Sequence, residues 1–452
     1  MDSLIRRLLF IVGILMLIQI ICGFVWMTVN IRVVPGFGDS AEYMELSRTW
    51  KLDEYRPILY PLLLRWMPGM KRNNPVFLYL FQTVVSYASL FYGVCTFDRA
   101  VSNRMCSGKR TGCQVFFSLY LMTIPMITFM NFSVLTDSLA TSLLILFLSG
   151  CIRLFGQEQI PIRICVFIAL SLIGESLLRA DRLYSCLLLT VIVFLIWMLR
   201  NRGYRKQAFI TALLLCVSVT AIVKVTDHFT QTPGVNNRVR TDFSFVLLDR
   251  IVWPNMEANY PFFSEEIQNT ISLEDAKLFD QHNNNVMYQL APMVESKVGK
   301  KKAGDMYCEM AKVVFFHQTK KVLLDIGEDI LSMAATPFSS MLNVHNLCRK
   351  GDSWNIYCMS SKTPKLTVFY NQFYQASFLF LILLGLLICI WRRNHQITSN
   401  TGAALRVLLP YIGMSLILTL WFSLGDGAPP NDRYAMIIYI TWAMVGRALL
   451  YI

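Results

Sequence analysis

Acidic residues and arginines gather in several short polar stretches of this chain, each beside a long apolar run. A carboxylate can remove a proton from an attacking hydroxyl group, and an arginine can hold a phosphate through its planar fork of donors. The residues of these two types are Asp39, Glu42, Arg56, Asp137, Glu175, Arg179, Asp181, Arg182, Asp426, Asp432 and Arg433. Together they have the parts for a group transfer in which a hydroxyl attacks and a phosphate leaves.

Long apolar runs must position these residues. The chain has 452 residues, of which 55% are hydrophobic and 16% are charged, whereas soluble domains carry about 25% charged residues. A helix needs roughly 20 mostly apolar residues to cross a bilayer core. We predict about ten membrane-spanning helices, near residues 8–29, 76–97, 113–131, 138–155, 164–178, 183–199, 207–226, 374–391, 403–424 and 434–451. The composition therefore predicts an all-α polytopic membrane protein. It excludes a soluble enzyme, a disordered chain and a nucleic-acid-binding domain.

The distribution of positive charge predicts the orientation in the membrane. The formal net charge is +13, and Lys and Arg concentrate near residues 99–110 and 200–206. Basic residues on short loops mark the cytoplasmic side. We therefore expect a multi-pass protein with both termini in the cytoplasm and the polar stretches at the outer face. A bacterial plasma membrane and an endoplasmic reticulum membrane both fit, and the absence of an evident retention signal favours the bacterial one.

The predicted organisation has three parts. Residues 1–226 form an N-terminal transmembrane module whose first outer loop covers about 30–75; residues 227–373 form a mainly helical extracytoplasmic subdomain; residues 374–452 form the C-terminal transmembrane helices. A stretch as long as 227–373 needs a fold of its own. Within it, Lys312 to Ala335 has the pattern of amphipathic helices. Cys348 and Cys358 bracket a polar turn, where we expect a disulfide, with two reduced thiols as the alternative.

The first outer loop is basic, against the rule that basic residues stay inside. It is predicted to hold a helix over 40–50 and an amphipathic helix over 58–67 that lies flat on the membrane. Its basic residues are Arg32, Arg48, Lys51, Arg56, Arg65, Lys71 and Arg72. Either they form a solvated or lipid-headgroup surface, or some of them bind a phosphate.

Each short outer turn contributes a carboxylate, and arginines share the same face. Wet, polar turns explain each residue taken alone. Their convergence indicates a polar cavity at the outer membrane face, which suits a substrate that is half lipid. Glycosyl transfer from a lipid-phosphate sugar needs such a cavity, because the leaving phosphate needs positive charge and the acceptor hydroxyl needs a base.

Five short motifs carry a resemblance to a known class. They are Gly38-Asp39-Ser40-Ala41-Glu42-Tyr43, Arg56-Pro57-Ile58-Leu59-Tyr60-Pro61-Leu62-Leu63, Leu135-Thr136-Asp137-Ser138-Leu139, Leu178-Arg179-Ala180-Asp181-Arg182 and Asp432-Arg433-Tyr434. With these motifs in this order, the chain resembles the GT-C superfamily of membrane glycosyltransferases, whose members use polyprenyl- or dolichyl-phosphate sugars. The motifs are spread over most of the chain. The paired Asp-Glu of the protein mannosyltransferases is absent, since Ser40 follows Asp39.

The resemblance implies a GT-C-like fold and an inverting transfer from a polyprenyl-phosphate-linked sugar to a glycan, lipid or protein acceptor. It makes Asp39 the general base and Glu42 the alternate acid. The implied substrate-binding residues are Arg56, Tyr60, Asp137, Arg179, Asp181, Arg182, Arg433 and Tyr434, with the arginines on the phosphate. Some members of the superfamily need a divalent metal. We expect no required cofactor here, with Mg²⁺ or Mn²⁺ between the carboxylates as the alternative.

Three other functions remain open at this point. A glycan polymerase or ligase would consume a diphosphate-linked oligosaccharide. A lipid-linked sugar flippase or transporter would place ionisable groups or broken helices near the membrane midplane, often in repeated halves, and the sequence has neither pattern. A purely structural or adaptor role is the third.

Overall fold

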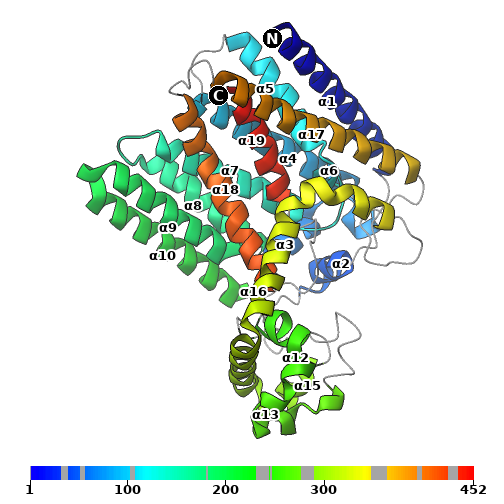
Figure 1. Ribbon diagram of the computed structural model, residues 1–452, viewed down its shortest axis with the longest axis vertical. Coiled ribbons are helices and arrows are strands. Elements are labelled where there is room, and N and C mark those ends of the chain that lie inside the picture. Colours follow the sequence, from blue (N-terminus) through cyan, green and yellow to red (C-terminus); the bar gives the residue numbers. More distant parts are fainter. Residues whose placement is uncertain are drawn as a thin grey trace. The chain divides into compact units, whose positions relative to one another are not determined.

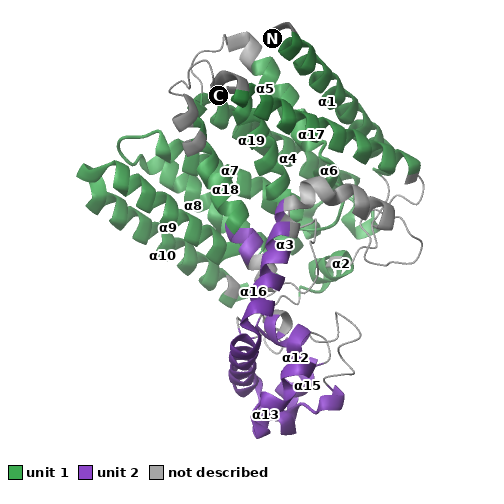
Figure 2. Cartoon of the chain, viewed as in Figure 1, with its two compact units in different colours: residues 1–236, 336–416, 432–452 green, residues 237–335, 417–431 purple. Residues whose placement is uncertain are grey.

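The computed structural model describes residues 2–31, 39–50, 56–101, 107–179, 182–230, 244, 247–275, 290–347, 364–393, 400–425 and 436–451. These residues form helices and turns, and none of them is in a strand, which confirms the predicted all-α class. The chain divides into two compact units, of residues 1–236, 336–416 and 432–452, and of residues 237–335 and 417–431 (Figure 2).

The first unit contains the apolar helices (Figure 1). They are α1 (Asp2–Asn30), α2 (Asp39–Thr49), α3 (Leu59–Trp66), η1 (Met70–Arg72), α4 (Val76–Val101), α5 (Ser107–Met122), α6 (Pro125–Asn131), α7 (Asp137–Phe155), α8 (Ile162–Leu178), α9 (Arg182–Arg200), η2 (Arg202–Tyr204), α10 (Arg205–Thr230), α17 (Pro364–Arg393), most of α18 (Asn400–Gly425) and α19 (Met436–Tyr451). The helices predicted over 40–50 and 58–67 are therefore confirmed as α2 and α3.

Six helices among the described residues are long and apolar enough to cross a membrane, by length and composition. They are α1, α4, α7, α9, α10 and α17, and the bent pair α5–α6 makes a seventh if it is one span. Shorter apolar stretches lie at Val407–Leu420 and Met436–Leu450. The chain is thus a multi-pass membrane protein, while the count of ten spans and the orientation of the termini stay predictions.

The apolar helices pack in neighbouring groups. α4 packs against α7, and α7 against α8; α1 packs against α17, and α17 against α19; α10 packs against α8 and α9. Small residues allow the close approach, as they commonly do between membrane helices. A Cβ atom on Gly446 of α19 would lie 2.9 Å from Cγ of Leu381 on α17, so only glycine fits this contact unless the leucine moves.

The span predicted over 113–131 is wrong as a single helix. It breaks between α5 and α6, which meet at 73°, and Pro125 begins the second piece. A break exposes backbone carbonyls that lipid cannot satisfy. Gln19 of α1 satisfies two of them, because its side-chain amide donates to the carbonyl oxygens of Tyr120 and Thr123 at 3.2 and 3.0 Å. Every residue of α6 is buried, so this irregular backbone is enclosed by protein.

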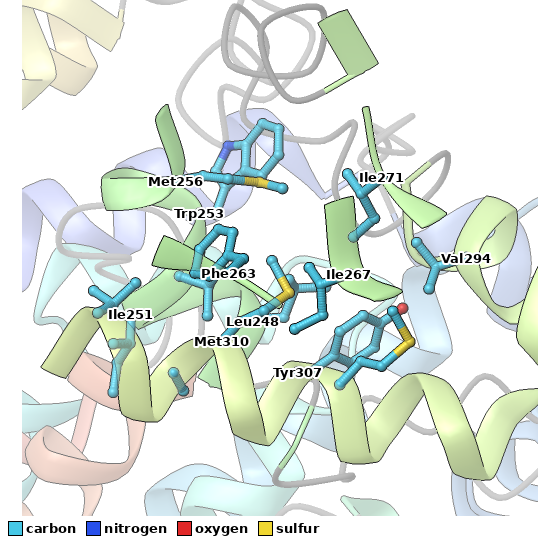
Figure 3. Close-up of a cluster of buried hydrophobic side chains, with 14 of the residues drawn as sticks. Leu248, Ile251, Trp253, Met256, Phe263, Ile267, Ile271, Val294, Tyr307 and Met310 are labelled. Atoms are coloured by element: carbon cyan, nitrogen blue, oxygen red, sulfur yellow. The ribbon is translucent and has the colours of Figure 1, made fainter. Parts of the chain in front are cut away.

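The second unit contains η3 (Leu248–Val252), η4 (Trp253–Asn255), α12 (Met256–Asn259), η5 (Tyr260–Phe262), α13 (Glu265–Thr270), α15 (Ala291–Val298) and the first part of α16 (Lys300–Leu347). Its apolar core lies between these short helices and α16. Figure 3 shows Tyr307 and Met310 of α16 beside Ile267 of α13, with Phe263 next to them. The core extends to Trp253.

The helix predicted over 312–335 is confirmed but is longer, since α16 begins at Lys300. It bends at Gln318, whose φ of −130° is not helical. The three-part division of the chain stays a prediction, and α17 begins at Pro364, inside the predicted outer subdomain.

A buried ion pair joins two helices that are far apart in the sequence. Arg447 of α19 donates from Nε and Nη2 to the two carboxylate oxygens of Asp98 on α4, at 2.9 and 2.7 Å. The guanidinium also lies 4.5 Å from the ring centroid of Phe117 on α5. Both charged side chains are almost fully buried, so each depends on the other for compensation.

Replacing Arg447 with Met should therefore destabilise the protein by about 3–5 kcal/mol, because an uncompensated carboxylate is left buried. Thermal unfolding in detergent checks this. Arg153→Met is the matched control, since Arg153 donates to the hydroxyl of Tyr92 at an exposed position. The double variant Asp98→Leu with Arg447→Met should be more stable than Arg447→Met alone. Equal melting temperatures for Arg447→Met and Arg153→Met would contradict this.

Candidate active site

The predicted general base lies at the start of a short helix. α2 begins at Asp39, and a carboxylate at a helix N-terminus is favoured by the helix dipole. Glu42 follows three residues later, so the two residues share one helix face. The side chain of Asp39 lies outside the described residues, and its role as base stays a prediction.

Glu42 forms an ion pair with the predicted phosphate ligand Arg56. Nε and Nη2 of Arg56 both donate to Oε2 of Glu42, at 3.0 and 2.7 Å. The arginine side chain is only 7% exposed, whereas that of Glu42 is 46% exposed. The guanidinium also lies 4.8 Å from the ring centroid of Tyr43 and donates to its hydroxyl at 3.3 Å. The pair therefore consists of an accessible carboxylate and a sheltered guanidinium that lies against an aromatic ring.

Tyrosines connect this pair to the membrane helices. The rings of Tyr43 on α2 and Tyr60 on α3 meet edge to face, with centroids 5.1 Å apart. The hydroxyl of Tyr60 donates to Oε1 of Gln82 on α4 at 3.1 Å. Tyr60 and Gln82 are fully buried. The predicted substrate residue Tyr60 thus fixes α3 to α4, and its hydroxyl is engaged within the protein.

Gln82 carries the contacts onward to α6 and α7. Its amide nitrogen donates to the backbone carbonyls of Asn131 and Ser133, at 2.8 and 3.0 Å. The side-chain oxygen of Asn131 accepts a 2.5 Å hydrogen bond from Ser138 in the first turn of α7. Asp137, the first residue of α7, is the chain neighbour of Ser138. A continuous series of contacts therefore links α2 to the N-terminus of α7.

A second ion pair lies at that N-terminus. Nη1 of Arg179, just after α8, donates to Oδ1 of Asp137 at 2.5 Å. Nearby in the chain, Nε of Arg182 at the start of α9 lies 3.9 Å from Oε1 of Glu175 on α8. All four side chains are buried or nearly so. Because α7 packs against α8 and α3 also contacts α8, the structure brings Asp137, Arg179 and Arg182 to the end of the bundle that carries α3.

The remaining predicted residues are not placed. Asp181, Arg433 and Tyr434 lie outside the described residues, as do Cys348 and Cys358. Within the described part of the chain, no three His, Cys, Asp or Glu side chains gather as a metal site would require. That no metal is required stays a prediction.

Sequence analysis missed Gln82, through which the contacts run from the Glu42–Arg56 pair to the N-terminus of α7. Gln82 is an amide within the apolar run 76–97, and polar residues inside membrane helices commonly mark function or helix contacts. That signal was available. The partners were not, because Asn131 and Ser133 are joined to Gln82 through their backbone carbonyls, which every residue carries.

Comparison with solved structures gives one partial likeness. The crystal structure of ArnT from Cupriavidus metallidurans bound to undecaprenyl phosphate aligns with a TM-score of 0.34 and 12% sequence identity, over 97% of this chain and 77% of that one. No protein-family model matches the sequence, and no curated protein does either. The chemistry of the site is therefore inferred from its own side chains.

Replacing Tyr60 with Phe should lower stability by about 1–3 kcal/mol, because a buried amide oxygen of Gln82 loses its donor. The measurement is the thermal midpoint of the purified protein. Tyr204→Phe serves as control, since its hydroxyl accepts from Gln159 at an exposed position and its loss should change little. A Tyr60→Phe midpoint as high as that of Tyr204→Phe would show that the Tyr60–Gln82 bond does not hold the site.

Proposed function

We propose that this protein is a membrane glycosyltransferase of the GT-C type. It transfers a sugar from a polyprenyl-phosphate-linked donor to a hydroxyl group of a glycan, lipid or protein acceptor, on the extracytoplasmic face of a bacterial plasma membrane. One observation supports the proposal above the others. Two carboxylate–arginine pairs, Glu42–Arg56 and Asp137–Arg179, are linked by an unbroken series of contacts at one end of a helical membrane domain.

The reaction needs a base and a phosphate site next to lipid. In the proposed step, Asp39 removes the proton of the acceptor hydroxyl, and the acceptor oxygen attacks the anomeric carbon on the face opposite the phosphate. A new carbon–oxygen bond forms as the bond to the phosphate oxygen breaks. The phosphate leaves with the bonding electron pair, and the configuration at the anomeric carbon inverts. The acceptor proton remains on the carboxylate until solvent removes it.

The arginines stabilise the charge that develops on the leaving phosphate. Arg56 and Arg179 present fixed guanidinium groups in a sheltered environment, where such charges act more strongly than in water. Each is neutralised by a carboxylate in this structure. A donor phosphate would compete with Glu42 for Arg56, and the exposed glutamate would then turn toward the acceptor. Such an exchange needs an acidic partner that has room to move, and Glu42 is the more exposed member of the pair.

Asp39→Asn should lower kcat/KM for transfer by about 100-fold or more, because a general base contributes roughly 10²–10⁴-fold. Glu42→Gln should have a smaller effect, since Glu42 is the alternate acid. The measurement is sugar release and transfer from a panel of polyprenyl-phosphate sugars by purified protein. Glu45→Gln is the matched control, because Glu45 is exposed on the same helix and the charge change is the same.

Three outcomes of this assay would contradict the proposal or replace it with another function. Full activity of Asp39→Asn would refute its role as base. Turnover of diphosphate-linked oligosaccharides alone would replace the proposal with a polymerase or ligase. Movement of a sugar lipid across vesicles with no transfer would replace it with a flippase.

The transferase should work without a divalent metal, because arginines supply the positive charge at the phosphate. Turnover in excess EDTA should equal turnover in Mg²⁺ or Mn²⁺. Loss of activity in EDTA that returns with either cation would instead assign the carboxylates to a metal.

A further inference from the structure

A hollow of about 610 Å³ opens where α1 ends and α4 begins, within the first unit. Its lining residues are Ile31, Asn73, Asn74, Pro75, Val76 and Phe77. α1 and α4 are both candidate membrane spans. Since these two ends belong to spanning helices, the hollow lies at a membrane surface. Its lining is polar at the two asparagines and apolar at Ile31, Val76 and Phe77.

An apolar stripe on α4 continues from the hollow. Phe77, Leu80, Phe81 and Val84 are 53%, 47%, 40% and 65% exposed, and their spacing of three and four residues puts them on one helix face. Exposed apolar side chains on a spanning helix face lipid tails. The hollow therefore opens at the edge of a lipid-facing surface.

The short helices that precede α4 carry exposed basic and aromatic side chains. We call Arg48, Arg65, Trp66, Lys71 and Arg72 the basic collar; all five are exposed, and Trp66 is 80% exposed. Nη2 of Arg48 donates to Oδ1 of Asn73 at 2.8 Å, which places this guanidinium at the rim of the hollow. Lys71 and Arg72 form no hydrogen bond or ion pair through their side chains with any described residue.

A tight turn positions Lys71 and Arg72 of the collar. The backbone amides of Arg72 and Asn74 both donate to the carbonyl of Gly69, at 2.9 and 3.0 Å. Gly69 has a φ of +85°, and a Cβ atom there would lie 2.6 Å from the carbonyl oxygen of Asn74. The turn therefore requires glycine, and it places Arg72 four residues before Val76, the first residue of the spanning helix α4.

We infer that the basic collar and the hollow form a binding site for an anionic phospholipid of the surrounding bilayer. The phosphate group is bound by Arg48, Lys71 and Arg72, and an acyl chain lies against Phe77 and the α4 stripe. Exposed Trp and basic residues at the end of a span are the features that anchor proteins at the headgroup level, and clustered basic residues recognise anionic lipids. This site is separate from the Glu42–Arg56 pair and does not depend on the proposed transferase activity.

The test uses the full-length protein in nanodiscs of phosphatidylcholine with increasing phosphatidylglycerol. The melting temperature of the wild-type protein should rise with the phosphatidylglycerol fraction. The variant Lys71→Gln with Arg72→Gln should lose at least half of that rise and retain at least twofold less phosphatidylglycerol on purification. Lys301→Gln with Lys312→Gln is the matched control, because both lysines are exposed on α16 and the charge change is the same.

Three outcomes overturn the inference. One is a melting temperature that rises equally with phosphatidylglycerol in the Lys71/Arg72 variant and in the control variant. Another is an increase in melting temperature on adding inorganic phosphate, without phosphatidylglycerol, that is as large as the increase caused by the lipid. That result would make the collar a free-phosphate site. The third concerns the wild-type protein alone: stabilisation that does not weaken as salt increases is not electrostatic. This last measurement remains decisive if the double variant does not fold.

Discussion

The structure depends on satisfying backbone carbonyls where no water can reach them. The break between α5 and α6 and the end of α6 leave such carbonyls inside the protein, and a lipid-embedded fold must pair each one internally. Gln19 pairs those at the break, and Gln82 pairs those of Asn131 and Ser133. Because Gln82 also accepts from Tyr60, the same amide that pairs the carbonyls at the end of α6 fixes α3 to the bundle.

This arrangement gives the polar ends of the helices a fixed framework. Arg56 is held by Glu42 and Tyr43, and Arg179 by Asp137. Buried charges of this kind are expensive unless paired, so the pairing is a condition for keeping arginines at a membrane surface at all. Under the proposed function, the donor phosphate replaces a carboxylate as the partner of these arginines. Stability and the proposed chemistry therefore both require that these arginines have an anionic partner.

Local patterns predicted what is local. The apolar runs indicated the helices, and the polar residues around Asp39, Arg56, Asp137 and Arg179 were recognised from type and spacing. Partners distant in sequence were not predictable, because no local pattern shows that Asp98 meets Arg447 or that Gln19 meets Thr123. Pro125 was visible as a helix breaker, but a break is tolerated only if distant donors exist, and Gln19 belongs to another helix. The pairing of Glu42 with Arg56 likewise needed the fold.

The most direct test is the binding of undecaprenyl phosphate to purified protein, measured for the wild type, Arg179→Gln and Arg163→Gln. The last two arginines lie at opposite ends of α8, so the charge change is matched. Arg179→Gln should weaken binding about tenfold or more, since a hydrogen bond to a charged group contributes about 1.5–3 kcal/mol, while Arg163→Gln binds as the wild type does. Equal affinity of all three proteins would contradict the phosphate site on which the proposed function depends.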